Sequence, residues 1–172
     1  MKKNIFLICL CGLFFTCRKK DEIDWTQYKA SCYISGSTWQ ASKVVFSLEP
    51  NNTLHFGLLK FNEANELRQS LSLDDLNISK DTVFLKHRNS LAPSANFATT
   101  ISHGDVLGEF YELLEDENFK SWVLLNKVSE DEISGQFQVA FKVDFRTSPL
   151  KNPLPDSIYL TKGVFFAHRK PE

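Results

Sequence analysis

The sequence is poor in glycine and proline, carries little net charge and has no apolar run of membrane-spanning length. Only 7 of its 172 residues are glycine and 6 are proline, and the chain contains no internal repeat and no low-complexity segment. The 15 phenylalanines supply ample apolar surface for a packed core, which argues against a disordered chain. A chain of this length is sufficient for one domain.

Charge of one sign is also lacking. The formal net charge is −1, and removal of an N-terminal segment with Lys2 and Lys3 leaves 18 basic and 21 acidic residues. This balance gives no electrostatic reason to bind nucleic acid or an anionic bilayer. We therefore predict no nucleic-acid partner.

Recognisable catalytic motifs are absent. The chain has no Gly-x-Ser-x-Gly elbow, no phosphate-binding glycine loop and no His-Glu-x-x-His helix motif. None of the four histidines stands at metal-ligand spacing from another ligand. We assign no catalytic residue, no metal ligand and no cofactor, and expect a non-enzymatic protein.

The acidic groups keep one alternative open. Carboxylates cluster at 74–75, 115–117 and 130–132. A pair of carboxylates can hydrolyse a glycosidic bond when a cleft holds them a defined distance apart. A small carboxylate-dependent hydrolase is therefore the alternative to a binding protein, and an inhibitor or structural partner of another envelope protein is a third.

The N-terminus has the pattern of an export signal. Lys2 and Lys3 precede an uncharged apolar segment, 5–15, which is eleven residues long. A spanning helix needs roughly 20 apolar residues, so this segment is too short to remain in a bilayer as a span. The segment ends at Thr16-Cys17, and charged residues follow at once.

This arrangement resembles a lipoprotein signal peptide, in which a cysteine at the cleavage point is acylated and becomes the new N-terminus. Phe14 and Thr16 depart from the usual Leu and the usual Gly, Ala or Ser at those positions. The resemblance implies a signal peptide over 1–16, lipidation of Cys17, a tether over 17–29 and a membrane partner through the lipid. An ordinary secretory signal or an uncleaved interfacial anchor is the alternative.

The residues after Cys17 resemble a sorting signal. Lys20, Asp21 and Glu22 are similar to the short Lys-then-acidic signal that sends Bacteroidota lipoproteins to the cell surface. The resemblance implies display on the outer membrane at the cell surface, with the periplasmic face as the alternative.

Only one cysteine, Cys32, lies beyond the predicted anchor. A single cysteine cannot form an internal disulfide. Cys32 alternates with Ala30 and Ile34 in a predicted strand, so we expect a buried, inert thiol.

Alternation of apolar and polar residues dominates the chain from residue 30 to 170. Its clearest instance is the row Phe137, Val139, Phe141, Val143 and Phe145, which is typical of a half-buried antiparallel strand. Further rows are predicted at Leu54, Phe56 and Leu58; at Leu71 and Leu73; at Trp122, Leu124, Asn126 and Val128; and at Ile158, Leu160, Lys162, Val164 and Phe166.

Turn signals separate these rows at short spacing, as at 35–37, 50–52, 62–66, 115–118 and 129–132. We expect two longer loops, 87–105 and 146–156, and a helix is conceivable only around 62–70 or 106–117. The pattern predicts a single all-β domain over 30–170, an antiparallel β-sandwich or barrel-like fold of about nine strands.

Three short segments carry a family resemblance. They are Gly36 with Trp39, the stretch 133–137 (Ile-Ser-Gly-Gln-Phe), and the stretch 160–165 (Leu-Thr-Lys-Gly-Val-Phe). Together they resemble a family of small Bacteroidota lipoproteins of unknown function. The resemblance implies an exported β domain and no activity.

We expect the domain to be a binding or accessory module whose long loops carry recognition, with a glycan or an envelope protein as partner. Candidate ligand residues in the loop 87–105 are Arg88, Asn89, Asn96, Phe97 and His103.

Two further triplets have a possible role in modification. Asp81-Thr82-Val83 and Asp156-Ser157-Ile158 resemble the Bacteroidota O-glycosylation sequon, which makes Thr82 and Ser157 candidate modification sites.

Overall fold

The computed structural model describes residues 27–79, 81–87, 92–148 and 150–168, which contain eleven β-strands and no helix. The strands are β1 (Gln27–Ile34), β2 (Ser37–Gln40), β3 (Lys43–Glu49), β4 (Thr53–Phe61), β5 (Leu67–Asn77), β6 (Thr82–Phe84), β7 (Ser94–Ile101), β8 (Val106–Leu113), β9 (Trp122–Val128), β10 (Glu132–Arg146) and β11 (Ser157–His168). All pairings are antiparallel. The predicted all-β antiparallel fold is confirmed.

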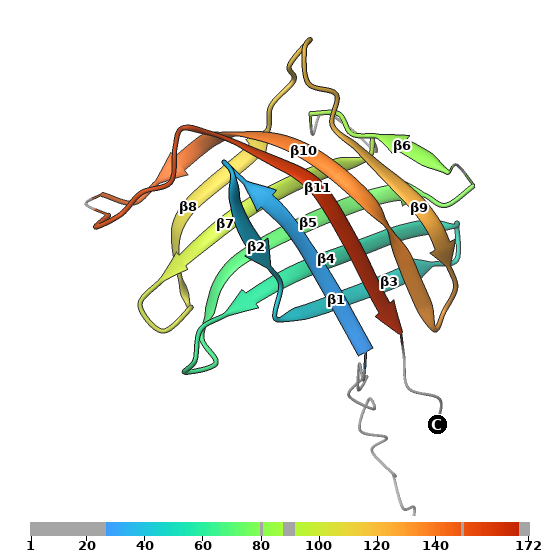
Figure 1. Ribbon diagram of the computed structural model, residues 1–172, viewed down its shortest axis with the longest axis horizontal. Helices are drawn as coiled ribbons and strands as arrows, with labels where there is room; N and C mark the ends of the chain where they lie inside the picture. Colours follow the sequence, from blue (N-terminus) through green and yellow to red (C-terminus); the bar gives the residue numbers. More distant parts are fainter. Residues whose placement is uncertain (1–26, 80, 88–91, 149, 169–172) are drawn as a thin grey trace, which may run out of the picture.

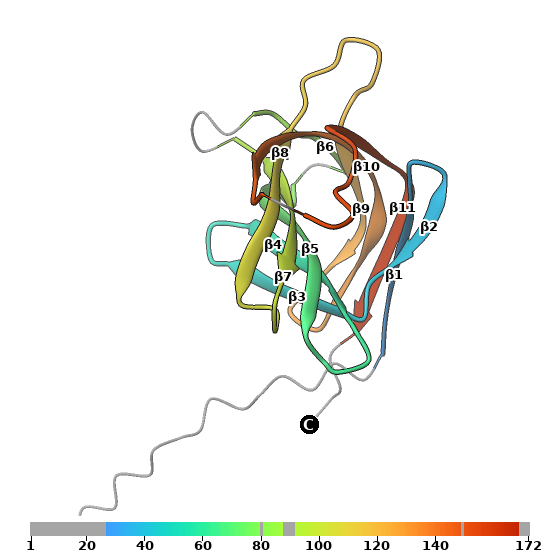
Figure 2. The same ribbon diagram turned by 90° about the vertical axis from the view of Figure 1, so that its left-hand side faces the viewer.

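The strands form one strongly curved sheet that does not close. Its main path runs β2-β1-β11-β10-β8-β7-β5-β4-β3, while β9 pairs with β10 and β6 pairs with β9. The strand β10 connects two layers, because its first half pairs with β9 and its second half pairs with β8. One layer holds β1, β2, β9 and β11, and the other holds β3, β4, β5, β7 and β8 (Figures 1 and 2).

The core fills the space between these layers. Its largest fully buried side chains include Phe97, Tyr111, Phe137 and Phe141. The inward residues follow the alternation expected for strands with one solvent-facing side. Cys32 is 2% exposed, so its predicted burial is confirmed, and this burial raises the pKa of its thiol to about 12.

The first predicted hairpin turn is also confirmed. Ser35 and Gly36 join β1 to β2, and both have positive φ angles, 49° and 85°. A two-residue hairpin loop favours this conformation because its twist matches that of the flanking strands. The turn brings Trp39 back into the core, where its Nε1 donates a hydrogen bond of 2.7 Å to Gln69.

Two glycines of β10 and β11 lie under phenylalanine rings of the neighbouring strand. Gly135 pairs with Phe165 and Phe137 pairs with Gly163 in the antiparallel register. A Cβ atom on Gly163 would lie 2.6 Å from the Phe137 ring, and one on Gly135 would meet the Phe165 ring and the Leu124 carbonyl oxygen. Each ring therefore covers the glycine of the opposite strand, which gives a structural reason for both glycine-containing segments.

A β-bulge at Lys162 interrupts the row of alternating residues that was predicted from Ile158 to Phe166. Ile158 and Leu160 are buried as expected, but Lys162 has a φ of 52° and the register shifts beside it. The inward side chains after the bulge are those of Phe165 and Ala167, and Val164 is 39% exposed. The single alternating row from 158 to 166 was wrong because a bulge inserts one residue and reverses the faces.

Two other rows also differ from expectation. The row of β10 leaves the core at its end, where Phe145 is 47% exposed after a register shift against β8. In β9 the buried residues are Val123 and Leu125, not the row that starts at Trp122. Both faces of that segment are apolar, so alternation alone did not identify the inward face.

The predicted loop 87–105 contains a strand, and neither conceivable helix is present. Within 94–101 lies β7, which occupies the middle of the sheet between β5 and β8. The residues 67–77 and 106–113 form β5 and β8. Together with the short strands β2 and β6, this explains why eleven strands are present where about nine were expected.

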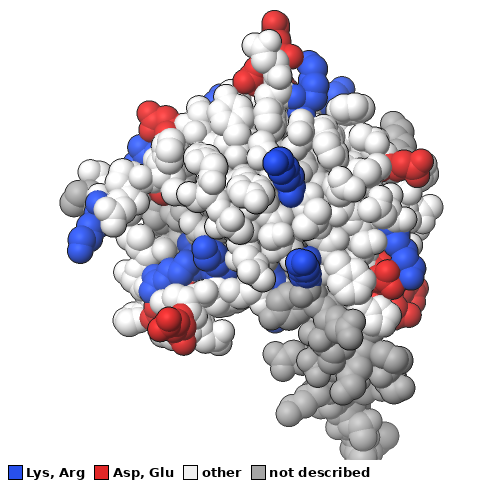
Figure 3. Space-filling view, in the orientation of Figure 1, with Lys and Arg blue, Asp and Glu red and all other residues white. Residues whose placement is uncertain are grey.

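The outer face of β1, β10 and β11 is mostly white in Figure 3, with isolated Lys or Arg side chains in its middle and no Asp or Glu beside them. Tyr33 is 43% exposed there, and the ammonium group of Lys162 lies 5.6 Å from its ring centroid. Within the described ranges, no helix has the length and apolar character needed to cross a membrane.

Candidate binding site

The short strand β6 is an edge of the sheet between two hollows. Among the described residues it pairs only with β9, and Val83 alone of its three residues is buried. Phe84 is the most exposed large apolar residue in that part of the chain, at 59%. Phe84 and Lys86 line both hollows, so this segment forms the wall between them.

The first hollow, here called the turn hollow, has a volume of about 700 Å³ and lies between β6 and the turn 114–121. This turn rises at the top of Figures 1 and 2 between β8 and β9. The ring of Phe119 packs edge-on against Tyr159, with centroids 5.1 Å apart, and the Tyr159 hydroxyl donates to Asp116 at 3.3 Å. These contacts attach the turn to β11.

The walls of the turn hollow are mixed. Leu114 and Phe119 contribute apolar surface, and Lys86 and Lys120 contribute ammonium groups that form no ion pair with a described residue. Three carboxylates, at 115–117, also line it. All three come from one turn, and no carboxylate from another described element faces them across this hollow.

The second hollow, here called the strand hollow, has a volume of about 600 Å³ and lies between β6, the end of β5 and the β3–β4 turn. Its polar lining includes Asn51, Thr53, Asp75, Asn77 and Lys86. The apolar part includes Val83, Phe84, Ala92 and Pro93.

Asp75 reaches this hollow through an irregularity in β5. Its φ angle is 59°, and the β4–β5 register shifts at this point. A left-handed aspartate within a strand is uncommon, and bulges of this kind often redirect a side chain at a functional site. The backbone N–H of Asp75 donates to His55 Nδ1 at 3.4 Å, which helps to hold this conformation.

Each described histidine lies beside a carboxylate that is distant in sequence. The pairs are His55 with Asp74 at 3.5 Å, His87 with Glu112 at 2.7 Å, His103 with Glu66 at 2.7 Å, and His168 with Glu132 at 3.5 Å. Sequence spacing gave no signal for these pairs, because the fold brings their distant segments together. No group of three potential metal ligands occurs in the described part of the chain.

The carboxyl groups in three of these pairs have lowered pKa values. For Glu66 the main cause is its hydrogen bond with His103, for Glu112 it is that with Lys142, and for Glu132 it is that with Lys127. A hydrogen bond or a positive charge favours the ionised carboxylate. Each of these three carboxylates also forms an ion pair with a lysine or arginine: Glu66 with Arg68, Glu112 with Lys142 and Glu132 with Lys127.

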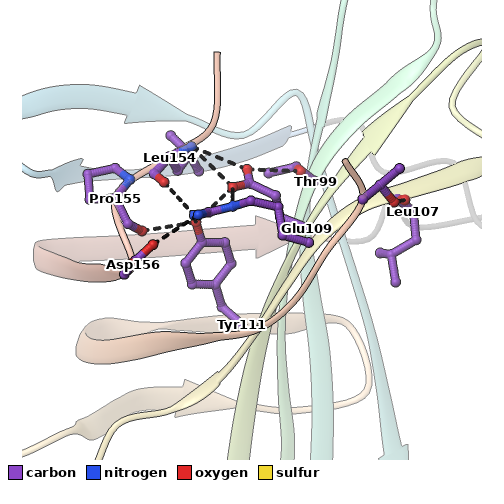
Figure 4. Close-up of polar contacts among 9 residues, drawn as sticks. Thr99, Leu107, Glu109, Tyr111, Leu154, Pro155 and Asp156 are labelled. Carbon is purple, nitrogen blue, oxygen red and sulfur yellow. Dashed lines mark hydrogen bonds and ion pairs between the residues drawn. The ribbon is translucent and has the colours of Figure 1, made fainter. Parts of the chain in front are cut away.

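Among the described residues, the most buried charged side chain is that of Glu109 of β8, which is 2% exposed (Figure 4). Its carboxylate accepts hydrogen bonds from Arg146 at 2.9 Å, from the Tyr111 hydroxyl at 3.1 Å and from the Leu154 backbone N–H at 3.2 Å. Arg146 also donates to Asp156 at 2.9 Å and to the Leu154 carbonyl at 2.7 Å. Loss of hydration, the largest cause, raises the pKa of Tyr111 to about 12.

This network attaches the β10–β11 connection to the end of the core. Figure 2 shows that connection curling between the two layers, where Leu154 packs against buried residues. Both carboxylate oxygens of Glu109 accept hydrogen bonds from donors within the protein. The network is therefore structural, since a buried carboxylate with this many partners is stabilised where it lies.

The candidate ligand residues are not brought together. Phe97 is fully buried in β7, so its proposed contact with a ligand is wrong, and Asn96 is a paired residue of the same strand. The His103 side chain is 90% exposed in the β7–β8 turn. Arg88 and Asn89 lie outside the described residues.

The remaining predicted positions are distributed as follows. Thr82 is exposed at the start of β6, and Ser157 is exposed at the start of β11. Cys17 and the stretch Lys20, Asp21 and Glu22 lie outside the described residues. Sequence reasoning missed Phe84, because an isolated phenylalanine in a short apolar stretch predicts a core position.

Comparison of the chain with protein-family models, with curated proteins and with solved structures gives no match.

Proposed function

We propose that this protein is a lipoprotein of the outer membrane, anchored through acylated Cys17 and displayed at the cell surface. Its β domain serves as a non-enzymatic binding module of the cell envelope. The N-terminal pattern supports the anchor, and the three short segments that resemble small Bacteroidota lipoproteins support the class.

The observation that carries the binding role is the pair of hollows on either side of β6. Their shared wall presents the exposed ring of Phe84 and the ammonium group of Lys86, which has no ion-pair partner among the described residues. Concave sites with apolar walls and a few convergent polar groups are typical of ligand binding.

The position of the hollows fits presentation away from a membrane. The ends of the described chain lie together, because Gln27 of β1 pairs with His168 of β11. In Figure 1 these ends are at the bottom of the molecule, and β6 is at the top. A tether that leaves from Gln27 would therefore hold the membrane at the end of the domain opposite to the hollows.

The carboxylates favour binding over glycoside hydrolysis. A hydrolase of that kind needs carboxyl groups that flank the bond to be cleaved. The three carboxylates of the turn hollow come from one turn, and the strand hollow has only Asp75 among the described residues.

The anchor is tested by replacing its cysteine in the native host. Cys17→Ala should abolish labelling by a fatty-acid probe and release the domain from the membrane fraction. Cys32→Ala is the matched control, and it should retain both labelling and membrane attachment, because Cys32 is buried in the core. Continued labelling of Cys17→Ala would overturn the anchor.

The binding role is tested by photo-cross-linking on intact cells. A photo-reactive phenylalanine analogue at position 84 should form an adduct with an envelope component. The same analogue at position 145 is the control, because Phe145 is similarly exposed, at 47% against 59%, and lines neither hollow. Equal labelling from both positions, or none from position 84, would contradict a binding site at β6.

The two candidate modification sites remain predictions. Thr82 and Ser157 are both exposed at strand starts, which gives a modifying enzyme access. Intact-mass spectrometry of protein from the native host should show added glycan that Thr82→Ala and Ser157→Ala each reduce. An unmodified mass would remove the proposal.

A further inference from the structure

We infer that the strand hollow binds a saccharide, with sugar hydroxyls on its amide groups and one sugar face on the ring of Phe84. This inference rests on the proposed binding function and names the ligand class of the same site.

Two exposed asparagines in the lining supply amide donors. The side-chain oxygen of Asn51 accepts a hydrogen bond from the Thr53 backbone N–H at 3.2 Å, and that of Asn77 accepts one from the Ser79 N–H at 2.9 Å. A backbone N–H can bond only to the oxygen of an amide, so these bonds fix which way each amide points. The nitrogen of each amide, with two N–H donors, has no partner among the described residues.

Asp75 adds an acceptor to the same lining. The left-handed bulge places its carboxylate in the lining, where its described ion pair is a long contact of 3.9 Å with His55 Nε2. The αL conformation of a non-glycine residue has an energetic cost, and such strain clusters at ligand sites. The bulge thus supplies an acceptor that a regular strand would direct elsewhere.

Phe84 adds an apolar surface beside these polar groups. Its ring is 59% exposed, while both of its neighbours, Val83 and Leu85, are buried and hold the backbone in place. The face of an aromatic ring carries partial negative charge, so it attracts the C–H groups on one face of a sugar ring.

The combination discriminates between ligand classes. Each sugar hydroxyl is both donor and acceptor, so a saccharide can satisfy the amides and the carboxylate together. A purely apolar ligand would strip water from these groups and leave them without hydrogen bonds. The lining carries one carboxylate, Asp75, and one ammonium group, Lys86, so its charges balance and do not select an anion. A single carboxylate is also too few for a metal site.

The test titrates the full-length protein with maltohexaose, cellohexaose, laminarihexaose, xylohexaose and mannohexaose by isothermal titration calorimetry. The detergent must lack a sugar headgroup. The protein must also be unglycosylated, because Thr82 borders this hollow. We expect at least one of these oligosaccharides to bind.

Isosteric variants locate the site. Asn77→Asp keeps the oxygen that accepts from Ser79 but replaces the two N–H donors by an acceptor, so it should fold normally and weaken binding about tenfold. Asn126→Asp makes the same change at an exposed asparagine of β9 outside the lining and should have no effect. Phe84→Ala should also weaken binding about tenfold, and Phe145→Ala should not.

The outcomes separate this inference from the proposed function. If none of the oligosaccharides binds, or if the Asn77 and Asn126 variants bind equally well, the saccharide inference is overturned. If cross-linking from position 84 persists in that case, the binding function stands with another ligand class. Failure of both experiments overturns both proposals.

Discussion

Replacing Gly163 by alanine should destabilise the protein through one identifiable contact. The new Cβ would lie 2.6 Å from three atoms of the Phe137 ring, whereas carbon atoms in good contact are about 3.5–4.0 Å apart. Phe137 is 1% exposed and surrounded by the core, so its ring cannot withdraw without moving other side chains. Overpacking of this kind costs about 1–3 kcal/mol, and we expect about 2 kcal/mol here.

The contact can be isolated with a double-mutant cycle. Phe137→Ala alone should lower the free energy of unfolding by about 3–5 kcal/mol, because it removes a buried aromatic side chain. In that background the clash is gone, and Gly163→Ala should be neutral or stabilising by about 0.5 kcal/mol, since glycine in a strand is entropically unfavourable. The two substitutions should therefore be coupled by about 2 kcal/mol.

Urea unfolding monitored by tryptophan fluorescence measures the free energy of unfolding of each variant. The comparison requires that the m-value, the slope of this free energy against urea concentration, is the same in all variants. Gly57→Ala is the matched control, because its Cβ would meet only Val45 at 3.2 Å and otherwise ordinary contacts. We expect it to cost clearly less than Gly163→Ala. An equal cost of Gly163→Ala with and without the Phe137 ring would refute the proposed packing.

Two further predictions concern charged groups. Glu109→Gln should lower the free energy of unfolding by about 3 kcal/mol, because a neutral amide replaces a carboxylate that is 2% exposed and accepts from Arg146, which then keeps only its ion pair with Asp156. Glu132→Gln, at an exposed pair, should cost about 1 kcal/mol or less in the same urea assay. The pKa of Glu112 is lowered by Lys142 and His87, so its ionised form stabilises the folded state above the unfolded value of 4.5 and this stabilisation is lost as the pH falls below it. Glu112→Gln should therefore flatten the decline in stability below about pH 4.5, and an unchanged acid limb in unfolding curves would contradict the pair.

Much of the fold could be predicted from the sequence, because the alternation of apolar and polar residues depends only on whether a segment is a strand with one buried face. The residues around Phe137 and Phe141 alternate with polar neighbours, and that pattern requires a strand with one buried face. The turn at Ser35 and Gly36 was predictable for a similar reason, since a two-residue hairpin needs positive φ angles. Cys32 was assigned correctly from its place in such a pattern.

The binding region was much less accessible. The prediction placed recognition in a loop at 87–105, but strand pairing takes its residues 94–101 into the middle of the sheet as β7. Phe84 and Asn77 lie outside the segment 87–105 and belong to no recognisable sequence motif. Their shared hollow lies between the end of β5 and β6, which pairs with β9, so it depends on contacts between segments that are far apart in the chain.

The sequence by itself determined that this protein is an all-β domain and which segments have one apolar face. Only the tertiary structure decided where a bulge reverses that face, as at Lys162, and which face of an all-apolar strand such as β9 points inward. It also decided which carboxylate each histidine meets and where Asp75 projects. The physical reason is that alternation depends on neighbours two residues apart, whereas register, bulges and hollows depend on partner strands far away in the chain.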